Sequence, residues 1–137
     1  MIGLSFVAMF ILMYAMVDRF SNVYFNINQF YMAGLMTTPM VVIELAVMRA
    51  MYMNKKLNAV LMISSVVALI AFYSLIRYQG AVGDKQFLRS MIPHHASALL
   101  MCQKASITDP EIKELCRNII LGQQSEIDLM KTKLTDK

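Results

Sequence analysis

The sequence predicts an all-α protein in which three transmembrane helices precede a two-helix antiparallel hairpin. Hydrophobic residues make up 58% of the 137 residues and charged residues only 16%, whereas soluble domains average about 45–50% and about 25%. Three apolar runs fill the first part of the chain, and apolar residues recur every three or four positions after residue 84. We therefore expect a membrane domain at 1–83 and an extracytoplasmic hairpin at 84–137.

The three predicted spans are the runs at 2–17, 29–48 and 57–76. The first is uncharged but would reach only about 24 Å as a helix, which is short for a bilayer core of about 30 Å. It lacks a preceding basic segment and a following small-x-small cleavage site, so we interpret it as a retained span and not as a signal peptide. The second run contains Glu44, and the third is the most uniformly apolar.

The basic residues between the runs predict the orientation in the membrane. The loop at 49–56 carries Arg49, Lys55 and Lys56, whereas the connector at 18–28 carries only Arg19. The positive-inside rule puts the basic loop in the cytoplasm. We therefore expect a multi-pass protein of the cell (inner) membrane whose C-terminal hairpin faces the periplasm or exterior.

The hairpin is predicted from helices at about 85–104 and 109–134, joined by a short turn. Thr108 and Glu111 fit a capping box at the start of the second helix, with a proline tolerated in its first turn. Pro93 predicts either a kink or a helix start, in which case Ser90 would be the N-cap.

A candidate metal site lies on the first of these helices, which holds both histidines of the chain. At about 100° per residue, one face about 120° wide carries five residues: Met91, His94, His95, Met101 and Cys102. Thioether, thiolate and imidazole donors together favour soft or borderline ions, copper(I) above all. The alternative is that the histidines are ordinary surface or core residues and that Met101 fills the core.

Folding the hairpin about position 109 brings further residues opposite this face. Cys102 then faces Cys116, and His95 faces Gln123 with Glu126 one turn on, while Met130 joins the inward stripe of the second helix. A metal site built from Met91, His94, His95 and Met130 is therefore plausible. For the two cysteines, we favour a disulfide or buried thiols over an additional metal site.

A second methionine pattern lies in the predicted membrane domain. Met32, Met36 and Met40 recur every fourth residue, and Glu44 continues the series. The functional interpretation is a transmembrane path for copper(I), and the simpler one is that methionine is an ordinary apolar residue in lipid. An ionisable residue inside a span usually faces a bundle interior, although Glu44 lies close enough to the basic loop to pair with Arg49.

The motifs MIPHHASALLMC, DPEIKELC and IILGQQSEIDLM resemble the family catalogued as domain of unknown function 305, over about residues 84–135. YMAGLMTTPM and MYMNKKLN resemble its membrane-anchored branch. The resemblance implies a ferritin-like helical bundle and an association with copper resistance. Many soluble relatives carry two hairpins and this chain has one, so the hairpin would be half of a four-helix bundle. We therefore expect two copies to pair as a homodimer or a higher homo-oligomer.

These observations predict a non-enzymatic, membrane-anchored protein that captures or buffers copper(I). No phosphate-binding loop, activated nucleophile or paired carboxylate indicates an enzyme, and the basic residues flank membrane runs and do not form a nucleic-acid footprint. The expected partners are therefore a metal ion, the lipid bilayer and a second copy of the chain. The alternatives are a copper transport component that uses the methionine path, or a structural, partner-binding membrane protein.

Overall fold

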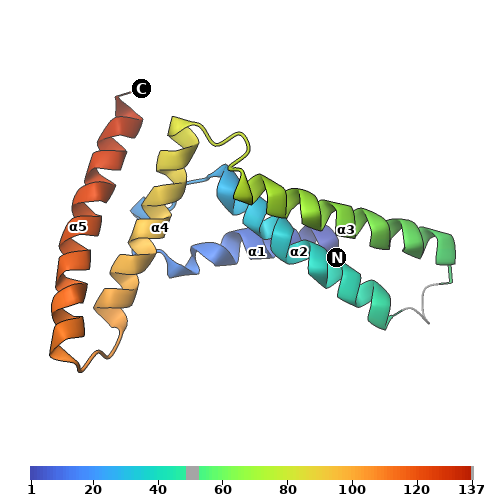
Figure 1. Ribbon diagram of the computed structural model, residues 1–137, viewed down its shortest axis with the longest axis horizontal. Helices are drawn as coiled ribbons and strands as arrows, with labels where there is room; N and C mark the ends of the chain where they lie inside the picture. The colour runs from blue at the N-terminus through green and yellow to red at the C-terminus, as the bar shows by residue number, and fades with distance from the viewer. Residues whose placement is uncertain (49–52, 137) are drawn as a thin grey trace. The chain divides into compact units, whose positions relative to one another are not determined.

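The computed structural model describes residues 1–48 and 53–136, and these form helices without any β-strand (Figure 1). The chain divides into two compact units, an N-terminal unit made of residues 1–13 and 27–81 and a hairpin unit made of residues 14–26 and the chain from 82 onward. The elements are, in order, α1 (Ile2–Leu12), the 3-10 turns η1 (Met13–Met16) and η2 (Phe20–Asn22), α2 (Ile27–Val47), α3 (Lys55–Arg77), α4 (Asp84–Lys104) and α5 (Pro110–Thr135).

Two helices, α2 and α3, are long and apolar enough to cross a membrane by length and composition. They have 21 and 23 residues, which correspond to about 31 Å and about 35 Å at 1.5 Å per residue. Their bounds agree with the predicted spans at 29–48 and 57–76. Of the predicted basic loop at 49–56, residues 49–52 lie outside the described residues, and with them the suggested pairing of Glu44 with Arg49.

The prediction of three transmembrane helices is wrong for the first run. Helix α1 has 11 residues, about 16 Å at 1.5 Å per residue, and the apolar run then tightens into the 3-10 turn η1. Tyr14 begins the connector, residues 14–26, which belongs to the hairpin unit. The hydroxyl of Tyr14 donates a 2.8 Å hydrogen bond to the carbonyl oxygen of Tyr24 in the same connector.

Within the N-terminal unit, α2 packs between α1 and α3. Aromatic rings link the three helices, because Phe30 of α2 lies 5.0 Å from Phe6 of α1 and 6.3 Å from Phe72 of α3, measured between ring centroids. Gly34 allows the closest approach, since a Cβ at this position would lie 2.5 Å from the ring of Phe72. The ring of Phe72 can therefore pack against the backbone of α2 because Gly34 has no side chain.

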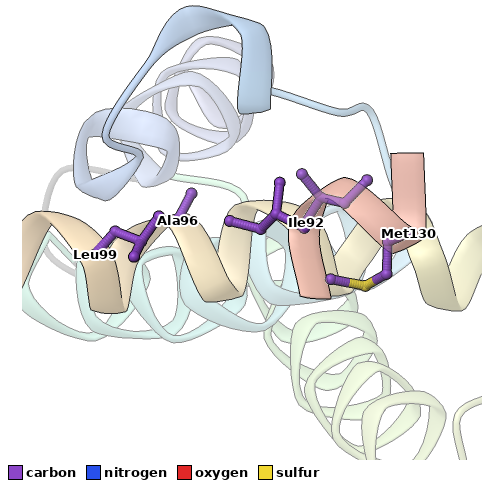
Figure 2. Packing of buried hydrophobic residues seen from close by; sticks show 5 residues of the cluster. Ile92, Ala96, Leu99 and Met130 are labelled. Atoms are coloured by element: carbon purple, nitrogen blue, oxygen red, sulfur yellow. The ribbon is translucent and has the colours of Figure 1, made fainter. Parts of the chain in front are cut away.

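In the hairpin unit, α4 and α5 run side by side in opposite directions (Figure 1), with bounds close to those predicted. A buried cluster joins the two helices, and Figure 2 shows its α4 members beside Met130 of α5. The cluster consists of Ile92, Ala96, Leu99, Ile127 and Met130. Burial of these side chains is the main hydrophobic contribution that holds the hairpin closed.

Both predictions about helix starts in the hairpin need correction. The N-cap of α5 is Asp109 and not Thr108, because its carboxylate accepts from the backbone N–H groups of Glu111 and Ile112. Pro110 then occupies the first helical position, where a missing N–H costs nothing. Ser90 is not an N-cap either, since α4 continues from Asp84 through Pro93.

The connector forms a third layer on the hairpin. Val17 and Tyr24 pack against the buried cluster, and η2 lies against α4. A polar chain ties the connector to α5, because the Lys131 ammonium donates to Asn22 Oδ1 and Asn22 Nδ2 donates to Asp18 at 2.6 Å. The hairpin core is therefore covered on one side by a segment that precedes α2 in the sequence.

A disulfide joins Cys102 of α4 to Cys116 of α5, with the two Cα atoms 5.3 Å apart. It closes the end of the hairpin next to the turn, and it is one of the two outcomes that the sequence favoured for this pair. Because both sulfurs are used in the bond, neither cysteine is a thiolate ligand in this state.

We expect Gly34→Ala to lower the stability of the N-terminal unit by about 1–3 kcal/mol, because the added methyl group forces the Phe72 ring away from α2. Thermal unfolding in detergent, followed by circular dichroism, measures the effect. Gly122→Ala is the matched control, since its Cβ would meet open space and alanine is the better helix former. A melting temperature for Gly34→Ala equal to or above that of the control would contradict the packing described.

Reducing the disulfide, or replacing both cysteines by Cys102→Ser and Cys116→Ser, should destabilise the hairpin by about 3 kcal/mol, the value for a closed loop of about 15 residues. Hydrogen exchange measured by mass spectrometry on α4 and α5 peptides should become faster. The double variant should show no further change with reductant. Unchanged exchange in a reduced protein whose two thiols are titratable would show that the bond does not stabilise the hairpin.

Candidate metal centre

The predicted ligands of α4 lie around Pro93, in the middle of a continuous helix. Adjacent helical residues project about 100° apart, so the two histidines occupy different environments. His95 is buried, with 8% of its surface exposed, whereas His94 is exposed. Their ring centroids lie 6.0 Å apart at an interplanar angle of 60°.

His95 is held from the facing helix by a carboxylate. Its Nε2 lies 2.7 Å from Oε2 of Glu126 on α5, and the side chains are 10% and 59% exposed respectively. The other ring nitrogen, Nδ1, is buried and has no hydrogen-bond partner in the described part of the chain. The same is true of Oε1 of Gln123, which lies one helical turn before Glu126 on α5.

The two predicted methionine ligands lie at the hairpin core. Met130 is a member of the buried cluster, with 8% of its surface exposed, and Met91 is half-buried and packs against that cluster. Figure 2 shows the thioether of Met130 on the side of α5 that faces α4. The structure thus brings Met91, His95 and Met130 to the contact between the two helices and leaves His94 on the outside.

The chemistry of the donors decides which ions this place suits. Among residues 1–48 and 53–136, no group of three His, Cys, Asp or Glu side chains is placed to hold a metal ion. The soft donors at this helix contact are the imidazole nitrogen of His95 and the thioether sulfurs of Met91 and Met130. That combination is typical of copper(I) and unsuited to magnesium or calcium.

The interpretation of Met101 as core filler is wrong, because 51% of its surface is exposed. The methionines of the suggested copper(I) path lie on α2, where Met32 is half-buried and Met36 and Met40 are exposed. Met36 and Met40 are 42% and 43% exposed. Glu44 is partly buried on the same helix. The buried face of α2 is a different one, formed by Tyr31, Ala33, Gly34, Thr37, Val41 and Leu45.

Glu126 and Gln123 are the functional candidates that the sequence analysis did not assign to the site. Folding the hairpin about position 109 already placed both of them near His95. A carboxylate opposite a candidate metal-binding histidine commonly holds the second ring nitrogen of that histidine, so this placement also predicts a role for Glu126. Both residues also lie within the motif IILGQQSEIDLM, so the signal was present in the sequence.

Comparison with known proteins identifies relatives but no characterised activity. The chain is 32% identical over 122 residues to an uncharacterised protein, L153, of Acanthamoeba polyphaga mimivirus, and the alignment covers 88% of this chain and 78% of the viral one. No solved structure matches the chain. The family model of a domain of unknown function (DUF305) matches residues 44–134, which include α3, α4 and all of α5 except its last residue. The chain therefore belongs to the DUF305 family.

Proposed function

We propose that this protein is a non-enzymatic, membrane-attached copper(I)-binding protein that captures or buffers the ion in copper homeostasis or resistance. The observation that carries the proposal is the buried imidazole of His95, which is fixed by Glu126 and whose Nδ1 has no hydrogen-bond partner among the described residues. Met91 and Met130 lie at the same helix contact and supply the soft donors that copper(I) prefers.

An apolar stripe on α4 supports the pairing of two copies. Phe87, Met91, His94, Ala98 and Met101 follow one another at alternating spacings of four and three residues, the pattern of a helix that packs against another helix. All five are exposed or half-buried. On α5, the same alternation places Leu115, Ile119, Gly122, Glu126 and Leu129 on one stripe.

Both stripes lie on the side of the hairpin away from the connector. The α4 stripe is centred about 180° around its helix from Ala96, which is fully buried. The α5 stripe is centred about 180° from Lys131, whose ammonium binds Asn22 of the connector. One face of the hairpin is thus covered within the chain, and the other presents apolar side chains to solvent.

A second copy of the hairpin is the occupant that we propose for this open face. Two hairpins joined there would form a four-helix bundle of the ferritin-like type, in which each helix buries its stripe. His94 lies at the middle of the α4 stripe, so pairing would bring the exposed histidines of both copies close to the two His95 sites. His94, the fourth predicted ligand, would then lie close to the metal site only in the dimer.

The membrane location and its orientation are also part of the proposal. We propose that the protein belongs to the membrane-anchored branch of the family. Helices α2 and α3 would span the cell (inner) membrane, and the hairpin would lie in the periplasm or exterior. The disulfide supports this side, because such bonds persist in oxidising compartments and are rare in the cytosol. The transport alternative would require Met36 and Met40 to line a path, whereas both are exposed on α2.

Titration of the full-length protein in detergent with copper(I), against a competing chelator, tests the proposed function. We expect His95→Ala to weaken binding most, because it removes the positioned nitrogen, and Met130→Leu to weaken it by at least tenfold while conserving the core volume. A double variant, Met36→Leu with Met40→Leu, is the control and should bind as the wild type does. Binding that survives His95→Ala but is lost in the control would move the site to the membrane helices.

The proposed dimer is tested by the mass of the protein–detergent complex. Met101→Lys places a charge in the α4 stripe and should convert a dimer to a monomer, because an unpaired ammonium would be buried at the contact. Leu121→Lys is the matched control, since this exposed leucine lies outside both stripes. A wild-type monomer, or dissociation by both variants alike, would overturn the pairing through this face.

A further inference from the structure

We infer that Glu126 is a positioning residue that fixes the tautomer and ring orientation of His95, so that the metal-binding atom is Nδ1. This inference rests on the proposed function, since it concerns the same site. It names the atom that carries the bond to the ion, and it assigns a role to a glutamate that would not itself touch the ion.

The tautomer follows from the geometry of the pair. Nε2 of His95 lies 2.7 Å from a carboxylate oxygen of Glu126, and an ionised carboxylate can only accept a hydrogen bond. Nε2 must therefore carry the hydrogen in this contact. In a neutral imidazole the other nitrogen then has no hydrogen, so the lone pair of Nδ1 is available for a ligand.

The surroundings of Nδ1 point to a cation as that ligand. A buried acceptor without a donor loses the hydrogen bond that it made to water in the unfolded chain. Oε1 of Gln123 on the facing helix is a second buried side-chain atom that has no hydrogen-bond partner in the described part of the chain. A positively charged ion bound to His95 would take up the lone pair of Nδ1 in place of that lost hydrogen bond.

The carboxylate of Glu126 would also strengthen the binding of an ion by His95. A histidine that donates its second N–H to a carboxylate is fixed in orientation before the ion arrives, and its ligating nitrogen is more basic. Removal of such a partner typically costs about 10–100-fold in metal affinity. Glu126 is thus expected to act on affinity through His95.

Because the chain has two histidines, nitrogen-15 labelling of histidine alone resolves both rings in the full-length protein by NMR. Long-range proton–nitrogen correlations report which nitrogen carries the hydrogen. In the ion-free protein at neutral pH, His95 should show a protonated Nε2 that exchanges slowly with solvent, and exposed His94 should not. Addition of copper(I), which is diamagnetic, should shift the Nδ1 signal of His95 most strongly.

Three variants separate positioning from a general structural role. Glu126→Ala should abolish the slowly exchanging Nε2 proton and weaken copper(I) binding by about 10–100-fold. Glu126→Gln should keep that proton, because its amide oxygen still accepts the hydrogen bond, and should retain part of the affinity. Glu114→Ala is the matched control: Glu114 is another paired glutamate of α5, bonded to Arg117 at 2.7 Å and 56% exposed, compared with 59% for Glu126.

The outcomes distinguish this inference from the proposed function. A hydrogen on Nδ1 of His95 in the ion-free protein, or a copper(I) shift confined to Nε2, would overturn the inference even if copper(I) binds tightly. Equal loss of affinity in Glu126→Ala and Glu114→Ala would also overturn it. If the Nε2 proton depends on Glu126 but neither the wild type nor any variant binds copper(I), the orienting hydrogen bond between Glu126 and His95 is supported and the proposed function is overturned.

Discussion

The register between α4 and α5 is the constraint on which the candidate site depends. The disulfide sets it near the turn, and the buried cluster that includes Ile92, Leu99 and Ile127 maintains it along the helices. With this register, Glu126 reaches His95. A shift of one residue along α5 would rotate each of its side chains by about 100°, which would remove the carboxylate from the histidine and Met130 from the core. The candidate site therefore depends on the register that the disulfide and the buried cluster impose on α4 and α5.

The connector gives the hairpin two unequal faces. A two-helix hairpin alone buries little apolar surface, and here Val17 and Tyr24 add a third layer over the core. The polar chain from Asp18 through Asn22 to Lys131 holds that layer in place. Since only one face is covered, the apolar stripes of α4 and α5 remain on the other. The connector thus stabilises one face of the hairpin unit and leaves the other face, with its apolar stripes, open to a second copy of the chain.

The two adjacent histidines show how one helical step separates two roles. His95 is shielded from solvent and is oriented by its contact with Glu126 of α5, whereas His94 is exposed on the apolar stripe of α4. Both imidazoles have the same chemistry in the sequence. Nε2 of His95 lies against the carboxylate of Glu126, an arrangement that would pre-organise this imidazole for the proposed ion within one chain.

The sequence by itself determined the helices that have strong and regular patterns. The apolar runs that became α2 and α3, the three- and four-residue spacing of α4 and α5, and the position of Cys102 opposite Cys116 across the turn all follow from local composition and helical geometry. The same reasoning put Glu126 near His95. These features were accessible because each depends on neighbours within one or two helical turns or on reflection about a single turn.

Tertiary structure alone decided the features that depend on contacts between distant segments. The first apolar run stops short of a span because Tyr14 and the connector fold against a hairpin that begins some seventy residues later, and no local pattern carries that information. The N-cap of α5 is a local feature by contrast, because Asp109 takes the place of Thr108 when the adjacent Pro110 occupies the first helical position. The difference between a buried His95 and an exposed His94 arises from packing, because burial is a property of what surrounds a side chain and not of the side chain itself.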